Sequence, residues 1–171
     1  MESRAKLLGH PIHPMLIVLP LGLFISAVVF DALYLWRGSA TFAAVAYWNI
    51  AGGISGGLLA CLLACLLAAV FGFIDRMAIP GGTRAKRIGL LHGGSNVVVV
   101  VAFALAWLLR GNAADLAPST GVFAVEVVAL ALGSVAGWLG GELVDRLGVG
   151  VDDGAHVNAT SSLSGRPARQ R

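Results

Sequence analysis

Residues 88–109, with the sequence IGLLHGGSNVVVVVAFALAWLL, form an apolar stretch that contains no charged side chain. The hydrocarbon core of a bilayer is about 30 Å thick, and a helix of roughly 20 apolar residues crosses it. The strands of a membrane barrel instead show about ten residues of alternating hydrophobicity. The continuous run here therefore predicts a transmembrane helix.

Three further stretches of the chain have the same character. They span about 14–36, 47–74 and 122–144, with an alternative start of the second near Thr41. Their only charged residues are Asp31, Glu126 and Glu142. Lipid offers no hydrogen-bond partners to backbone N–H and C=O groups, and a helix satisfies these groups within its own segment. We therefore expect an all-α, integral membrane four-helix bundle. Residues 1–13 would precede the membrane domain of residues 14–151, and a polar, disordered tail would occupy residues 152–171.

The composition agrees with a membrane protein. Of 171 residues, 57% are hydrophobic and 12% are charged, about half the charged share of roughly 25% in soluble domains. This excludes a soluble enzyme and a disulfide scaffold. No nucleophile elbow, phosphate loop or zinc-protease motif is present, so we do not expect a stand-alone enzyme. The net charge of +3 does not indicate nucleic-acid binding.

The basic residues predict the orientation of the chain. Cytoplasmic loops of membrane proteins carry an excess of Lys and Arg. Ten of the twelve basic residues fall on one side of the four spans, and only Arg37 and Arg110 fall on the other. The sequence thus predicts that both termini are cytoplasmic, in a multi-pass protein of the bacterial inner membrane.

Polar residues gather near the cytoplasmic ends of the spans. His10 and His13 lie in an HPIHP segment, and His92 is roughly 6 Å inside the third span, with Asn96 one turn further on. Asp75 and Glu142 stand at the same ends of the second and fourth spans.

Three interpretations of this inner cluster remain open. Imidazoles bind haem iron and transition metals, so His10, His13, His92 and Asn96 could hold haem b, or the three histidines with Glu142 a metal. Alternatively, these side chains only join the helices by hydrogen bonds. In the third interpretation the imidazoles bind and release protons.

A second polar pair lies near the outer ends of the spans. Asp31 and Glu126 are each roughly 7–8 Å from the outer ends of their helices. Because they lie at the same depth in the membrane, the two side chains can contact each other. Two carboxyl groups in contact share a proton, because like charges that close do not both ionise. Asn49 is a further candidate partner. The pair either joins two helices or, with the inner histidines, forms part of a proton or ion path.

Glycines spaced four apart predict close helix packing. Small residues at this spacing let a second backbone approach. The second and fourth spans carry two sets, which would pack inside the bundle or form a homodimer: Gly52, Gly53, Gly56, Gly57, and Gly133, Gly137, Gly141.

The chain resembles a bacterial family of four-span membrane proteins, the domain of unknown function DUF2231. The resemblance covers about residues 7–151 and rests on LGHPIHPMLIVLPLG, GFIDRMAIPGGTRAKRIGLLHGGSN and GWLGGELV. Many members continue with tyrosine, arginine and histidine where this chain has Asp145, Arg146 and Leu147. If that histidine is a metal or haem ligand in other members, this chain lacks the ligand, because it has Leu147 at the position.

The resemblance implies a four-helix inner-membrane protein but no assigned activity. Some members look fused to Rieske-type iron–sulfur domains, which suggests redox work and a membrane redox partner. We therefore carry three hypotheses: a redox-associated module that binds haem b or a metal, a non-enzymatic assembly protein, and a proton or ion conductor.

Overall fold

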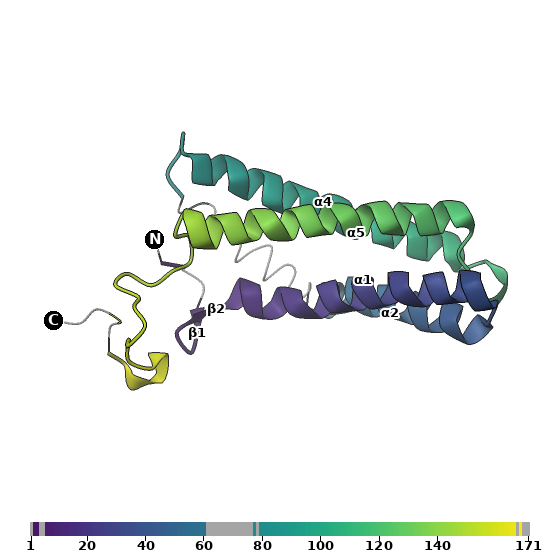
Figure 1. The fold of residues 1–171 in the computed structure, drawn as a ribbon, viewed down its shortest axis with the longest axis horizontal. Helices are drawn as coiled ribbons and strands as arrows, with labels where there is room; N and C mark the ends of the chain where they lie inside the picture. Colours follow the sequence, from purple (N-terminus) through teal and green to yellow (C-terminus); the bar gives the residue numbers. More distant parts are fainter. Residues whose placement is uncertain (1, 4–5, 61–76, 78, 167, 169–171) are drawn as a thin grey trace.

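The computed structural model describes residues 2–3, 6–60, 77, 79–166 and 168, and four α-helices dominate this part of the chain. They are α1 (Ile12–Arg37), α2 (Ala40–Ala60), α4 (Arg84–Arg110) and α5 (Thr120–Gly141). A π-helical turn, η3 (Glu142–Arg146), extends α5. Figure 1 shows the α1–α2 and α4–α5 pairs lying side by side along one common axis.

Local sequence sets the ends of these helices. Gly38 has a left-handed φ of 70° and its N–H donates to the Tyr34 carbonyl at 2.7 Å, which ends α1. Thr83 caps α4 by accepting from the Lys86 backbone N–H, and Ser119 caps α5 by accepting from that of Val122. The 3₁₀ turn η2 (Ala114–Leu116) joins α4 to α5.

Three of the helical segments are long and apolar enough to cross a membrane: Ile12–Arg37, Arg84–Arg110 and Ala114–Arg146. They contain the spans predicted at 14–36, 88–109 and 122–144. The helix α2 begins at Ala40, one residue from the alternative start near Thr41, because the turn at Gly38 and Ser39 is followed by an alanine-rich stretch that favours helix. The rest of the span predicted at 47–74 lies outside the described residues.

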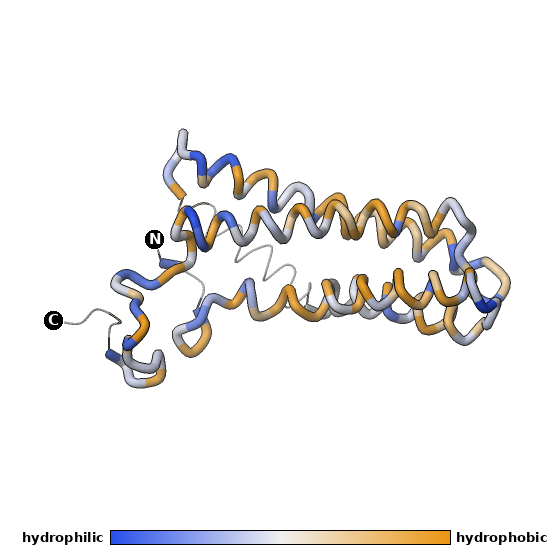
Figure 2. The backbone as a smooth tube through the Cα atoms, in the orientation of Figure 1, coloured by the Kyte–Doolittle hydropathy of each residue, from blue (hydrophilic) through white to orange (hydrophobic). Residues whose placement is uncertain are grey.

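Hydrophobic residues predominate along most of the length of the helices, and hydrophilic residues gather toward their ends (Figure 2). Val98, Val101 and Leu105 are more than half exposed on α4, as expected of a helix that faces lipid. All four helices meet in one buried cluster, with the Phe24 and Phe103 rings stacked at 4.1 Å. The buried members of this core are Phe24, Ala27, Ala46, Ile50, Val99, Phe103 and Ala129.

The two ends of the chain meet beside the helices. A short antiparallel hairpin pairs β1 (Lys6–Leu7) with β2 (His10–Pro11), and the segment after η3 runs past it to the 3₁₀ turn η4 (Ser162–Ser164) (Figure 1). Lys6 bonds to both Glu2 and Asp152. The hydrogen bond to Asp152, and to a smaller extent that to Glu2, raises the pKa of Lys6. The hydrogen bond from Lys6 in turn lowers the pKa of Glu2.

This contact predicts a pH window for the tail. The lowered pKa of Glu2 stabilises the contact above its usual value of 4.5, and that contribution is lost as the pH falls through the lowered pKa. The raised pKa of Lys6 stabilises the contact below its usual value of 10.5, and that contribution is lost as the pH rises through the raised pKa.

We expect Asp152→Asn to speed amide hydrogen exchange in the segment after η3 at neutral pH. Asp115→Asn, an exposed substitution in η2, is the matched control and should leave this exchange unchanged. Equal protection in both variants would show that the Lys6 contact does not hold the segment.

Candidate functional site

The most buried polar cluster lies where all four helices approach η2. We name Arg110, Asp31 and Glu126 the buried triad; each is at most 1% exposed. Arg110 Nη1 donates to Asp31 Oδ2 at 2.6 Å and to Glu126 Oε1 at 3.3 Å, and Nη2 donates to Asp31 Oδ1 at 2.9 Å. The bond from α4 to α1 is thus bidentate, the strongest form of an arginine–carboxylate pair.

The remaining Arg110 donors bind backbone carbonyls. Nη2 donates to the Ala43 carbonyl of α2 at 3.0 Å, and Nε donates to the Leu116 carbonyl of η2 at 3.0 Å. Leu116 and its neighbour Asp115 have φ of 56° and 55°, a left-handed conformation that non-glycine residues rarely adopt. One side chain therefore joins α1, α2, α4 and α5 and holds a strained loop.

Sequence reasoning placed Asp31 and Glu126 together but missed Arg110. Arg110 was counted among the outer-side charges, since it is the last residue of α4. Two acids at one depth within an apolar bundle were the signal that a cation should be sought nearby. Asn49, the expected third partner, instead donates to Ser26 Oγ at 2.9 Å.

A second polar group lies toward the opposite end of the helices. His92 Nδ1 donates to the Ala136 carbonyl of α5 at 2.8 Å, because a carbonyl can only accept. The Asn96 side-chain nitrogen donates to the His92 carbonyl at 3.0 Å and lies 3.4 Å from His92 Nε2. A Cβ built on Gly140 would lie 3.1 Å from His92 Cε1, so the glycine leaves room for the ring.

The ring of His13 on α1 approaches the ring of His92 on α4. Their centroids are 6.0 Å apart and their planes are inclined by 81°. We call these two side chains the histidine pair. Because His92 Nδ1 carries the proton donated to Ala136, Nε2 is the nitrogen left with a lone pair, and the Asn96 side-chain nitrogen lies 3.4 Å from it.

The other expected ligands have partners elsewhere. His10 is exposed and lies 3.3 Å from Ser162 Oγ, and Glu142 Oε1 accepts from Arg84 at 2.6 Å. Within the described residues, no group of three or more His, Cys, Asp or Glu side chains could hold a metal ion. The expected cluster of several ligands is thus reduced to two imidazoles; Asp75 lies outside the described residues.

The predicted packing glycines take several different positions. A Cβ on Gly53 would lie 2.6 Å from the Phe24 ring, and one on Gly52 would lie 3.4 Å from Leu23, so both face α1. A Cβ on Gly133 would lie 3.8 Å from the Val99 methyl groups of α4, and one on Gly141 would lie 3.9 Å from Asp145 Oδ2. A Cβ on Gly137 would meet nothing within 4 Å. The surroundings of Gly56 and Gly57 are outside the described part of the chain.

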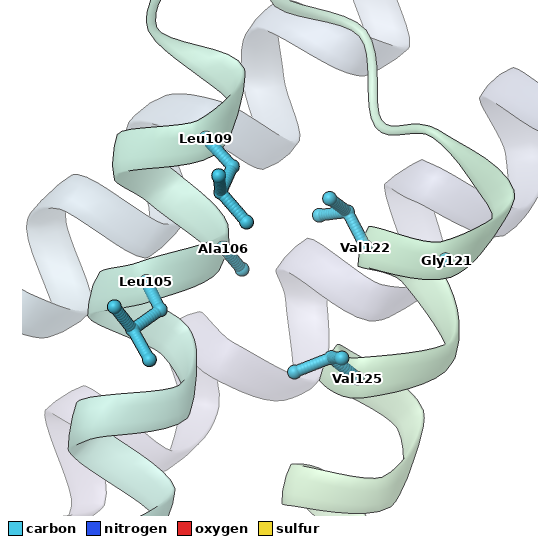
Figure 3. Close-up of a pocket in the computed structure, with 6 residues that line it drawn as sticks. All are labelled: Leu105, Ala106, Leu109, Gly121, Val122 and Val125. Atoms are coloured by element: carbon cyan, nitrogen blue, oxygen red, sulfur yellow. The ribbon is translucent and has the colours of Figure 1, made fainter.

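An apolar pocket opens between α4 and α5 on the η2 side of the bundle (Figure 3). It is lined only by apolar side chains and a glycine, so it offers no chemistry beyond contact with hydrocarbon. The lining residues are Leu105, Ala106, Leu109, Gly121, Val122 and Val125.

The apolar spans and buried ionic cluster define a helical membrane protein. Residues 9–153 match the family described as "Predicted membrane protein (DUF2231)", and the chain belongs to this family. The resemblance drawn from the sequence motifs is thereby confirmed. No curated protein and no solved structure matches the chain.

The buried triad predicts an asymmetric response to mutation. Arg110→Met should lower the free energy of unfolding by about 3 kcal/mol or more, because it leaves buried carboxyl groups without their partner. Arg84→Met removes a half-exposed partner of Glu142 and should cost no more than about 1 kcal/mol.

Unfolding in mixed detergent micelles, followed by tryptophan fluorescence, measures both values. Equal costs for the two variants would contradict the special position of Arg110.

Proposed function

We propose that this chain is a small redox-associated membrane module in which His13 and His92 bind haem b iron or a transition-metal ion. The carrying observation is the geometry of the histidine pair, with ring centroids 6.0 Å apart. Two imidazole nitrogens on one ion, at about 2.0–2.1 Å each, place ring centres roughly 5–6.5 Å apart. The separation in this chain falls inside that range.

The surroundings of His92 support this proposal. A metal-ligating histidine usually donates its other ring N–H to a carbonyl or carboxylate, which fixes the tautomer and the ring orientation. His92 Nδ1 makes such a bond to Ala136, so Nε2 is directed as a ligand would be. His13, rather than His10, is then the second ligand, since His10 lies at Ser162.

The membrane placement is part of the same proposal. Four spans within residues 14–151, with both termini cytoplasmic, would put the histidine pair in the cytoplasmic leaflet of a bacterial inner membrane. The excess of basic residues on that side supports this orientation. The meeting of the first and last segments beside the same helix ends is consistent with it (Figure 1).

A non-enzymatic assembly role is the second candidate. His92, Asn96 and Glu142 all have protein partners, so the polar residues could serve only to join helices. Gly52, Gly53 and Gly133 face neighbouring helices of the same chain, which favours intramolecular packing over a homodimer at these positions.

A proton or ion conductor receives less support. The buried triad and the histidine pair lie toward opposite ends of the helices, and the stacked Phe24 and Phe103 rings lie between them along α1 and α4. This apolar layer disfavours a continuous polar path.

The proposal predicts a Soret band, or one equivalent of a transition metal, in the detergent-purified full-length chain. His13→Ala and His92→Ala should each change the band or lower the metal content strongly, because each variant removes one of the two proposed protein ligands. His10→Ala is the discriminating control and should retain the band or the metal, as should His156→Ala in the tail. Visible spectroscopy and elemental analysis on the same samples distinguish haem from a metal ion.

Purified protein with neither chromophore nor stoichiometric metal would reject the cofactor proposal. The assembly role would then be favoured, and it expects His92→Ala to lower stability or partner recovery only.

A further inference from the structure

The charges of the buried triad do not balance if both carboxyl groups are ionised. One guanidinium faces two carboxyl groups, and all three side chains are at most 1% exposed. Within the described part of the chain, the ion pairs of this cluster involve these three side chains alone. An uncompensated charge in such a medium is very costly, and a carboxylate avoids the cost by taking up a proton.

Among the described residues, the elements that accept hydrogen bonds from Arg110 add no further charge to the cluster. The helix α2 contributes the Ala43 carbonyl, which accepts from Arg110 Nη2 at 3.0 Å. The η2 turn contributes the Leu116 carbonyl, and its carboxylate, Asp115, is exposed. The net charge of the cluster is therefore set by Asp31, Glu126 and Arg110.

The hydrogen bonds distinguish the two carboxyl groups. Both oxygens of Asp31 accept from Arg110, at 2.6 and 2.9 Å, which stabilises an ionised carboxylate. Glu126 accepts only one bond, at 3.3 Å, and its Oε2 is buried with no partner among the described residues. An oxygen in that position is the natural place for an added proton.

We propose that the buried triad is a proton-binding site, in which Glu126 carries one proton at neutral pH while Asp31 and Arg110 remain ionised. The proton comes from water and bonds to Glu126, so the cluster becomes neutral overall. The proposal is independent of the histidine pair and of any cofactor there.

Infrared spectroscopy of the full chain in lipid nanodiscs tests this directly. A protonated carboxyl group gives a carbonyl stretching band that shifts when water is exchanged for D₂O, whereas ionised carboxylates do not contribute to that band. We expect such a band at neutral pH in the parent protein. It should vanish in Glu126→Gln, in which a neutral amide of similar shape replaces the protonated acid.

Two further variants keep the test decisive if Glu126→Gln does not fold. Asp31→Asn should also abolish the band, because Glu126 must then ionise to balance Arg110. Arg110→Gln should roughly double it, because both carboxyl groups then bind a proton. Glu142→Gln, which removes a carboxylate paired with Arg84 at the other end of the helices, is the matched control and should leave the band intact.

The absence of the band in the parent protein would overturn the proposal. Its persistence in Glu126→Gln or in Asp31→Asn would also do so, because the proton would then be located elsewhere.

Discussion

The rest of the structure depends on the hydrogen bonds of the Arg110 guanidinium, which is buried among four helices. It contacts a side chain of α1, a side chain of α5, a backbone carbonyl of α2 and another of η2. Between helices in lipid the hydrophobic effect gives little preference, so packing and polar contacts must specify the arrangement. Arg110 supplies the polar contacts at one end, and the Phe24–Phe103 stack supplies packing at the middle.

This arrangement separates two polar sites by an apolar layer. The buried triad is fully enclosed, and within the described residues Glu126 Oε2 is its one buried side-chain oxygen or nitrogen that has no hydrogen-bond partner. The histidine pair is only partly buried, and the contact of His92 Nε2 with the Asn96 side-chain nitrogen is long, at 3.4 Å. The enclosed site is suited to fixing the helices and holding a proton, and the more open site is suited to a ligand.

The sequence predicts the helices better than it predicts the contacts between them. An uninterrupted apolar run predicts α4, and the alternative start near Thr41 lies one residue from the observed start of α2 at Ala40. Equal depth suggested that Asp31 and Glu126 meet. Hydropathy could not reveal that Arg110, at a helix end, turns back between them, nor that Glu142 pairs with Arg84, because both depend on helix rotation and on side-chain reach.

A double-mutant cycle between Arg110 and Asp31 tests the central claim most directly. The free energy of unfolding would be measured in detergent micelles for Arg110→Met, Asp31→Asn and the double variant. Side chains joined by a bidentate buried bond should show a coupling energy of about 1.5–3 kcal/mol. Additive costs, with a coupling energy below about 0.5 kcal/mol, would contradict the account.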